Sequence, residues 1–201
     1  MFVIVRHGNT FEADEPPRRI GARTDLPLTA AGVAQASALG HHLAAEGHRL
    51  TRVLVSPLRR TRQTAEAILQ HQAPGLAPET CEWLREIDHG PDEDMPEEVV
   101  RTRIGQPALD AWDKHAVSPP GWIVDGEPRV SAWRALFAAP QVGATLIVTS
   151  NGAARFALLA EPAPVTASRQ LQSLKLPTGS YGMIVHDADG VLGISSWGRR
   201  P

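Results

Sequence analysis

Three adjacent residues near the start of the chain, Arg6, His7 and Gly8, have types that suit phosphate chemistry. An imidazole can accept a phosphoryl group as a nucleophile, and a guanidinium binds phosphoryl oxygens through a planar pair of donors. The apolar run from Phe2 to Val5 that leads into them is typical of a strand buried on both faces of a parallel sheet. Ligands of such sheets bind beyond the carboxyl ends of the strands. These residues alone do not decide between a phosphate site and a strand that simply ends at the surface.

A second segment repeats this design. Residues 52–55 predict a strand that runs into a helix, with Ser56 as the N-cap and Pro57 as the first helical residue. The predicted helix carries Arg60 and two further arginines in its first turns. Because free N–H groups and the macrodipole at a helix N-terminus favour anions, arginines there strengthen a phosphate site.

A third strand is predicted over residues 145–149, and it ends just before Asn151 and Gly152. A further helix is expected after it. Because the carboxyl ends of parallel strands meet at one edge of a sheet, we expect His7, Arg60 and Asn151 to face the same rim.

In the order of its motifs, the chain resembles the histidine phosphatase superfamily, which includes cofactor-dependent phosphoglycerate mutases and fructose-bisphosphatase-type phosphatases. The similarity covers nearly the whole chain in ordered blocks: the nucleophile motif at 6–10, the lead into a helix at 21–36, an arginine block at 56–65 and an acidic segment at 84–93. The resemblance implies one domain over residues 1–201 with a phosphoglycerate mutase-like α/β fold. That fold is a three-layer, doubly wound, mainly parallel sheet with helices on both faces, and it carries a helical capping insertion at about 91–126.

The resemblance also implies roles for individual residues. His7 is the expected nucleophile, Arg6 and Arg60 are expected to clamp the phosphoryl oxygens, and Glu86 stands at the proton-donor position. For that role Glu86 must carry a proton at the working pH, which we expect burial to favour. The expected phosphate-binding set is Arg6, Asn9, Thr10, Arg60, Asn151 and Gly152.

One residue departs from the family pattern. Asn151 stands where the family has a second histidine that helps to hold the charge of the transition state. An amide still donates a neutral hydrogen bond but supplies no positive charge. The loss of one such contact costs roughly two to three decades of rate, by analogy with the removal of an oxyanion donor. His89 is close to Glu86 in the sequence and is a second candidate histidine for the pocket. We expect it to lie outside the pocket.

The leading functional prediction is a metal-independent phosphatase that hydrolyses a small phosphate monoester through a phosphohistidine at His7. The alternative is a catalytically weakened phosphate-binding or interaction module, which Asn151 permits and the retained Glu86 argues against. A phosphomutase is disfavoured, because residues 10–13 lack the Ser-x-Trp-Asn continuation of the mutases of the superfamily.

Composition restricts the remaining classes. The chain has 201 residues, 42% of them hydrophobic, and a formal net charge of -2, so no bulk positive field recruits nucleic acid or an anionic membrane. No stretch approaches the roughly 20 apolar residues of a membrane span. The single cysteine, Cys81, has no intramolecular disulfide partner, and the chain enters its first strand without a leader pattern, so we expect a cytoplasmic protein. No cofactor and no metal are expected, the expected partner is a small phosphate ester, and a homodimer is left open.

The remaining elements follow from periodicity and turn signals. Thr29 is the expected N-cap of a helix from Ala30 to about Glu46, and residues 12–23 predict a loop over the pocket mouth. Further helices are expected at 97–104, 108–115 and 128–139, and a hairpin is expected with strands at 181–186 and 191–196.

Overall fold

The computed structural model describes residues 1–140 and 142–201 of the protein. In this part of the chain the strands form one mixed sheet in the order β3-β2-β4-β1-β5-β6. Strands β1 to β4 run parallel, β5 pairs antiparallel with β1, and β6 pairs antiparallel with β5. The strands are β1 (Phe2–Arg6), β2 (Leu50–Val55), β3 (Pro78–Thr80), β4 (Ala144–Thr149), β5 (Tyr181–His186) and β6 (Leu192–Arg199). The predicted mainly parallel sheet and the terminal hairpin are confirmed.

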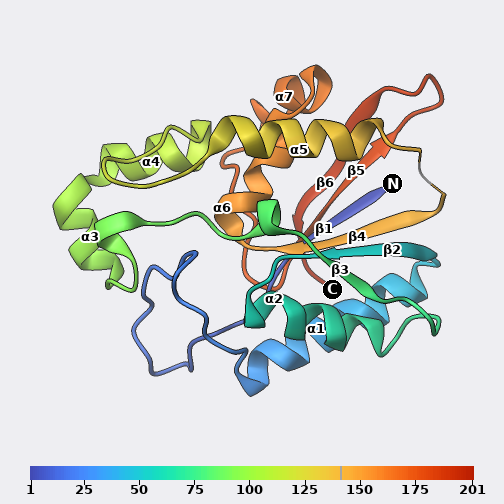
Figure 1. Ribbon diagram of the computed structural model, residues 1–201, viewed down its shortest axis with the longest axis horizontal. Helices are drawn as coiled ribbons and strands as arrows, with labels where there is room; N and C mark the ends of the chain where they lie inside the picture. Colours follow the sequence, from blue (N-terminus) through green and yellow to red (C-terminus); the bar gives the residue numbers. More distant parts are fainter. Residues whose placement is uncertain (141) are drawn as a thin grey trace.

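Helices cover both faces of this sheet, as Figure 1 shows, and confirm the predicted three-layer α/β fold. One face carries α1 (Ala30–Ala45) and α2 (Arg59–Leu69). The other carries α5 (Gly126–Ala138), α6 (Asn151–Ala154) and α7 (Pro162–Ser168). Beyond the carboxyl ends of the strands lie α3 (Glu97–Ile104) and α4 (Gln106–His115), which confirm the helical insertion.

The central strand β1 shows why the sheet needs both helical layers. Val3 and Val5 pack with the residues beneath α1 and α2, whereas Phe2 and Ile4 pack with those beneath α5. Side chains of a strand alternate between faces, so a strand that is apolar at every position must be covered on both.

The register of the parallel strands aligns their ends. Arg6 lies opposite Thr149 in β4, and Val55 of β2 lies opposite Val148. The backbone N–H of His7 donates to Thr149 O at 3.1 Å. The residues that follow these strands therefore start from the same edge of the sheet.

The predicted start of α2 is wrong. Ser56 is not its N-cap and Pro57 is not helical; the helix begins at Arg59 after the extended, buried residue Leu58. The backbone N–H of Arg59 donates to Asp25 Oδ1 at 2.6 Å. A carboxylate from a distant loop therefore caps the helix, and local sequence rules do not see it.

The segment after β4 also differs from the continuous helix expected there. It forms α6 and then a 3₁₀ helix at Arg155–Leu159. Among the described residues, no helix is long and apolar enough to cross a membrane.

Candidate active site

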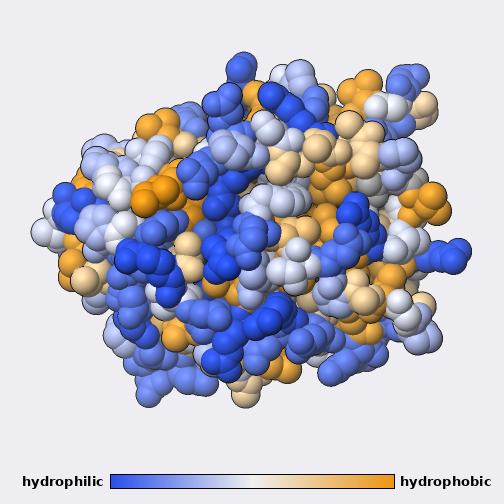
Figure 2. All heavy atoms as spheres, viewed as in Figure 1, coloured by the Kyte–Doolittle hydropathy of each residue, from blue (hydrophilic) through white to orange (hydrophobic). Residues whose placement is uncertain are grey.

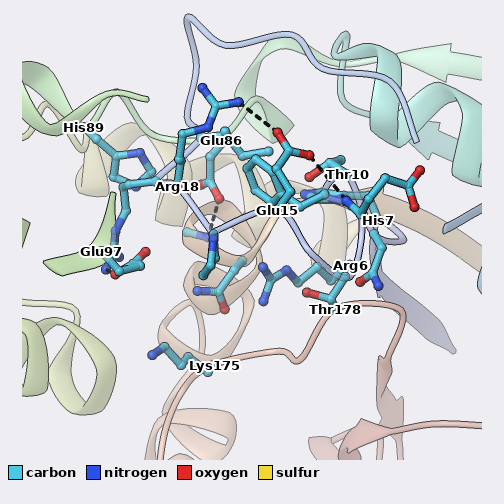
Figure 3. A pocket seen from close by; sticks show the side chains of 18 of the residues that line it. Arg6, His7, Thr10, Glu15, Arg18, Glu86, His89, Glu97, Lys175 and Thr178 are labelled. Carbon is cyan, nitrogen blue, oxygen red and sulfur yellow. Dashed lines mark hydrogen bonds and ion pairs between the residues drawn. The ribbon is translucent and has the colours of Figure 1, made fainter. Parts of the chain in front are cut away.

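A cavity of about 510 Å³ opens at the carboxyl ends of the parallel strands. The predicted residues Arg6, His7, Glu86 and Asn151 line it together with Asn9, Thr10 and Gly152. Figure 3 shows Arg6, His7 and Thr10 at one end, His89 and Glu97 at the other, and Glu86 between them. The structure therefore gathers the predicted site residues around one cavity, except Arg60, which does not line the cavity and instead contacts His7 through its Nε.

The two nitrogens of His7 have different partners. Nδ1 lies 2.8 Å from Gly8 O, and Nε2 lies 3.2 Å from the Nε–H of Arg60. Because a carbonyl only accepts, the proton resides on Nδ1, and the unprotonated Nε2 accepts the hydrogen bond from Arg60. Burial, reinforced by Arg60 and Arg6, holds the pKa of His7 well below its usual range. The imidazole is thus a neutral nucleophile, only 4% exposed, with Nε2 as its reactive atom.

Arg60 reaches His7 from the first turn of α2 and is completely buried. Its terminal nitrogens donate to Thr24 O at 2.6 Å and to Gly21 O at 3.1 Å. Burial lowers its pKa, which Glu86 partly offsets. Neutral acceptors, His7 Nε2 among them, thus hold the Arg60 guanidinium beside the imidazole.

Arg6 provides the second guanidinium. Its Nη1 donates to Leu176 O at 3.0 Å, and its Nε has no hydrogen-bond partner within residues 1–140 and 142–201. Burial lowers the pKa of Arg6 to about 10, with Glu86 acting in the opposite direction. At neutral pH the residue therefore stays charged.

Both carboxylate oxygens of Glu86 accept backbone hydrogen bonds. Oε1 accepts from the Ile87 N–H at 2.8 Å, and Oε2 accepts from the Gly152 N–H at 2.9 Å. The bond to Gly152 ties Glu86 to the segment after β4. It also occupies the N–H that we expected to face a phosphate, so direct phosphate binding by Gly152 stays a prediction.

Asn151 is oriented by the backbone of Leu176, whose N–H donates to Oδ1 at 2.9 Å. Since Oδ1 is occupied, the amide NH₂ is the group left for a ligand in the cavity. Asn151 is therefore placed as a neutral donor.

The backbone of Asn9 is held by Gln35 of α1 and by Thr29, the residue before α1. Asn9 N–H donates to Gln35 Oε1 at 3.0 Å, and Asn9 O accepts from Thr29 N–H at 3.0 Å. Thr29 is also the N-cap of α1, as predicted. Asn9 and Thr10 thus line the cavity from a fixed backbone.

A buried carboxylate fixes the loop that binds Arg60. Glu93 Oε1 accepts from the N–H groups of Gly21 and Arg23 and from Thr24 Oγ1, at 2.9, 3.0 and 2.7 Å. Burial raises the pKa of Glu93, but its contacts with His89 and Thr24 outweigh this and lower the pKa to about 2. Glu93 therefore binds backbone N–H groups of this loop, and Arg60 binds backbone carbonyls of the same loop.

His89 lines the cavity, so the position outside the pocket that the sequence favoured is wrong. Its ring packs edge-on against Trp122 with centroids 4.6 Å apart, and Nδ1 lies 3.6 Å from Glu93 Oε2. It stands at the end of the cavity away from His7 (Figure 3).

The predicted loop over the pocket mouth supplies much of the remaining wall, and its hydrophilic side chains dominate the lower left of Figure 2. The sequence did not single out the wall residues themselves, because they share no motif or period. They are Phe11, Glu12, Glu15, Pro17, Arg18, Arg19, Ile20, Glu97, Trp112, Lys175 and Thr178.

The cations of this wall are paired with carboxylates. Arg18 pairs with Glu15, and Arg19 pairs with Glu97. The wall away from His7 is thus polar with its charges balanced. Within the described ranges, no group of three or more His, Cys, Asp or Glu residues is arranged to hold a metal ion.

Sequence comparison finds a family match over almost the whole chain. The model of the histidine phosphatase superfamily (branch 1) matches residues 2–195. A probable phosphoglycerate mutase GpmB of Proteus mirabilis (strain HI4320) is 34% identical over 180 residues, covering 84% of this chain and 78% of the relative. A protein of the same name from Yersinia pestis (strain Pestoides F) is 31% identical over 179 residues, with the same coverage.

Solved structures share the fold at lower identity. A mycobacterial glucosyl-3-phosphoglycerate phosphatase superimposes with a TM-score of 0.77 at 19% identity, covering 100% of this chain and 99% of that one. A phosphoserine phosphatase of Entamoeba histolytica, in complex with 3-phosphoglyceric acid, gives a TM-score of 0.72 at 18% identity, with coverage of 98% and 95%.

Proposed function

Because this chain belongs to the histidine phosphatase superfamily (branch 1), we propose that it hydrolyses small phosphate monoesters through a phosphohistidine at His7. The observation that carries the proposal is the pair of contacts on this imidazole. Gly8 O fixes the proton on Nδ1, and the unprotonated Nε2 accepts a hydrogen bond from the Arg60 Nε–H. When a bound phosphoryl group takes over the Arg60 donor, the Nε2 lone pair of this neutral imidazole is free to attack phosphorus.

In the first step, Nε2 of His7 forms a bond to phosphorus while the bond from phosphorus to the alcohol oxygen breaks. Glu86 gives a proton to the departing oxygen, so the alcohol leaves neutral. Arg6 and Arg60 stabilise the charge of the phosphoryl oxygens, and the Asn151 amide adds a neutral donor.

In the second step, the Glu86 carboxylate takes a proton from a water molecule whose oxygen attacks phosphorus. The phosphorus–nitrogen bond breaks, inorganic phosphate leaves, and His7 returns to its neutral form. The positive charge in both steps comes from guanidinium groups, so we expect activity without an added metal.

The cavity supports a small substrate. Its volume is about 510 Å³, and the wall away from His7 offers balanced pairs such as Arg19 with Glu97. Such a wall suits a compact alcohol that carries several polar groups. The names of the structural neighbours, a glucosyl-3-phosphoglycerate phosphatase and a phosphoserine phosphatase, agree with this substrate class.

A second candidate is a phosphate-binding module with little turnover, and the neutral amide of Asn151 favours it. The sequence relatives are named probable phosphoglycerate mutases, which gives a third candidate. Residues 10–13 lack the mutase continuation, which disfavours that reading.

A direct assay separates these functions. We expect the purified protein to release phosphate from 4-nitrophenyl phosphate and from an alkyl phosphate, in buffer that contains EDTA. His7→Ala should lower the rate at least 10³-fold, whereas His115→Ala, on the insertion helix α4, should leave it unchanged. Phosphate or vanadate that raises the Tm without any turnover would favour the binding module. Interconversion of phosphoglycerate isomers without phosphate release would favour a mutase.

A further inference from the structure

We propose that Lys175 supplies to the bound phosphoryl group the positive charge that Asn151 lacks. The inference rests on the proposed function, because it assigns a partner to the same phosphoryl site. It follows from the position of Lys175 beside that site and from the arrangement of its present partner.

The backbone next to Lys175 forms part of the phosphoryl site. Leu176 N–H donates to Asn151 Oδ1 at 2.9 Å, and Leu176 O accepts from Arg6 Nη1 at 3.0 Å. The two groups that bind Leu176 are thus both expected to contact phosphate. Lys175 is the adjacent residue, and its side chain lines the same cavity, below Arg6 in Figure 3.

The segment that carries Lys175 is fixed on the insertion. Leu174 N–H donates to Asp113 O at 2.8 Å, and Lys175 N–H donates to Ser173 Oγ at 3.1 Å. Ser173 Oγ in turn donates to Asp113 O at 3.2 Å. The backbone of Lys175 is therefore anchored to α4, whereas its side chain remains 50% exposed.

Asp113, which forms an ion pair with Lys175, also lies close to the guanidinium of Arg155. Lys175 Nζ lies 2.6 Å from Asp113 Oδ2, and Arg155 Nη2 lies 3.9 Å from Asp113 Oδ1. Arg155 is completely buried, and in the described parts of the chain its Nη2 has no hydrogen-bond partner. When Lys175 turns toward a phosphoryl group, Arg155 can therefore take over Asp113, so no carboxylate is left without a cation.

This exchange requires little energy, since an ion pair at this exposure contributes little to stability. A phosphoryl group carries more negative charge than one carboxylate and is a stronger partner for an ammonium group. The other wall cations are less suited to the role. Arg18 is shared by Glu15 and Asp94, and Arg19 pairs with Glu97 while it packs over Trp122.

A double-mutant cycle tests the proposal. The variants are Lys175→Met, Asn151→His and the double variant, assayed with 4-nitrophenyl phosphate for kcat and KM and with inorganic phosphate for Kd. We expect Lys175→Met to lower kcat/KM about 10- to 100-fold and to weaken phosphate binding, whereas Lys175→Arg retains most of both. With histidine at position 151 the same lysine change should cost less than about threefold.

Lys114→Met, which removes a lysine from the same insertion helix, is the matched control and should leave kcat/KM unchanged. An equal loss from Lys175→Met in both backgrounds, or no loss in either, would overturn the proposal. The phosphate Kd distinguishes this failure from failure of the proposed function. If the protein turns over no ester, the same cycle on Kd still supports or refutes the role of Lys175.

Discussion

Replacement of Gly152 by alanine displaces the proposed proton donor without removing it. A Cβ at this position would overlap Glu86 Oε1 and would lie 3.0 Å from both Glu86 Cδ and Ile87 Cγ1. The carboxylate cannot rotate away freely, because Ile87 N–H and Gly152 N–H hold its two oxygens. The carboxyl group must therefore shift by about 1 Å to regain ordinary contact distances.

A shift of about 1 Å in a reacting group costs on the order of 10²-fold in rate. The loss should depend on the leaving group, because an alkoxide needs a proton to depart and a nitrophenolate does not. We therefore expect Gly152→Ala to lower kcat/KM for an alkyl phosphate about 100-fold and kcat/KM for 4-nitrophenyl phosphate less than about 10-fold. The crowding should also reduce the free energy of unfolding by roughly 1–3 kcal/mol.

Steady-state kinetics on both substrates, with thermal unfolding alongside, measure these effects. Gly193→Ala is the matched control, because a Cβ there meets no atom within 4 Å, and it should change neither quantity. Equal losses of kcat/KM for the two leaving groups in a folded Gly152→Ala protein would refute the role of Glu86 as proton donor.

Three further outcomes follow from the site. The folded-state pKa of His7 lies well below 6.5, so below that pH the unfolded chain binds more protons than the folded one. As the pH drops below 6.5, the free energy of unfolding of the wild-type protein, measured in urea, should therefore fall relative to that of His7→Gln by up to ~1.4 kcal/mol per pH unit. Parallel curves for the two proteins would contradict this. Glu93→Gln should reduce the free energy of unfolding at pH 7 by on the order of 3 kcal/mol, because Glu93 has a pKa of about 2 in the folded protein. Its ionised carboxylate stabilises the fold above pH 4.5, and this contribution is lost toward pH 2. An unchanged free energy of unfolding at pH 7 would count against this role. Arg60→Lys should lower kcat/KM about 10²- to 10³-fold, since an ammonium group cannot reach Gly21 O, Thr24 O and His7 together; a change in KM alone would contradict the clamp.

Much of the fold was predictable because its signals are local. The apolar run of β1 indicates burial on both faces, and Thr29 caps α1 through its own side chain. The insertion helix at Glu97–Ile104 was predicted at its observed bounds. The gathering of His7 and Asn151 at one rim followed from the general rule that parallel strands end at one edge.

The remaining features depend on contacts between residues far apart in the chain. Asp25 caps α2 from outside, and Gly152 binds the carboxylate of Glu86. The Leu176 backbone orients Asn151, and it lies in an irregular segment that has no periodicity to predict its place. Such contacts depend on tertiary structure, so sequence patterns of a few residues carry no signal for them. The homodimer left open by the sequence also stays a prediction.

Covalent transfer of the phosphoryl group to His7 is the step on which the proposed hydrolysis depends. Rapid acid-free quenching during steady hydrolysis of 4-nitrophenyl phosphate, followed by peptide mass spectrometry, measures this directly. We expect an acid-labile phosphoryl group on His7 that forms within one turnover and is absent from the His7→Ala protein. Steady phosphate release from the wild-type protein with no phosphoryl group on His7 at any quench time would contradict it.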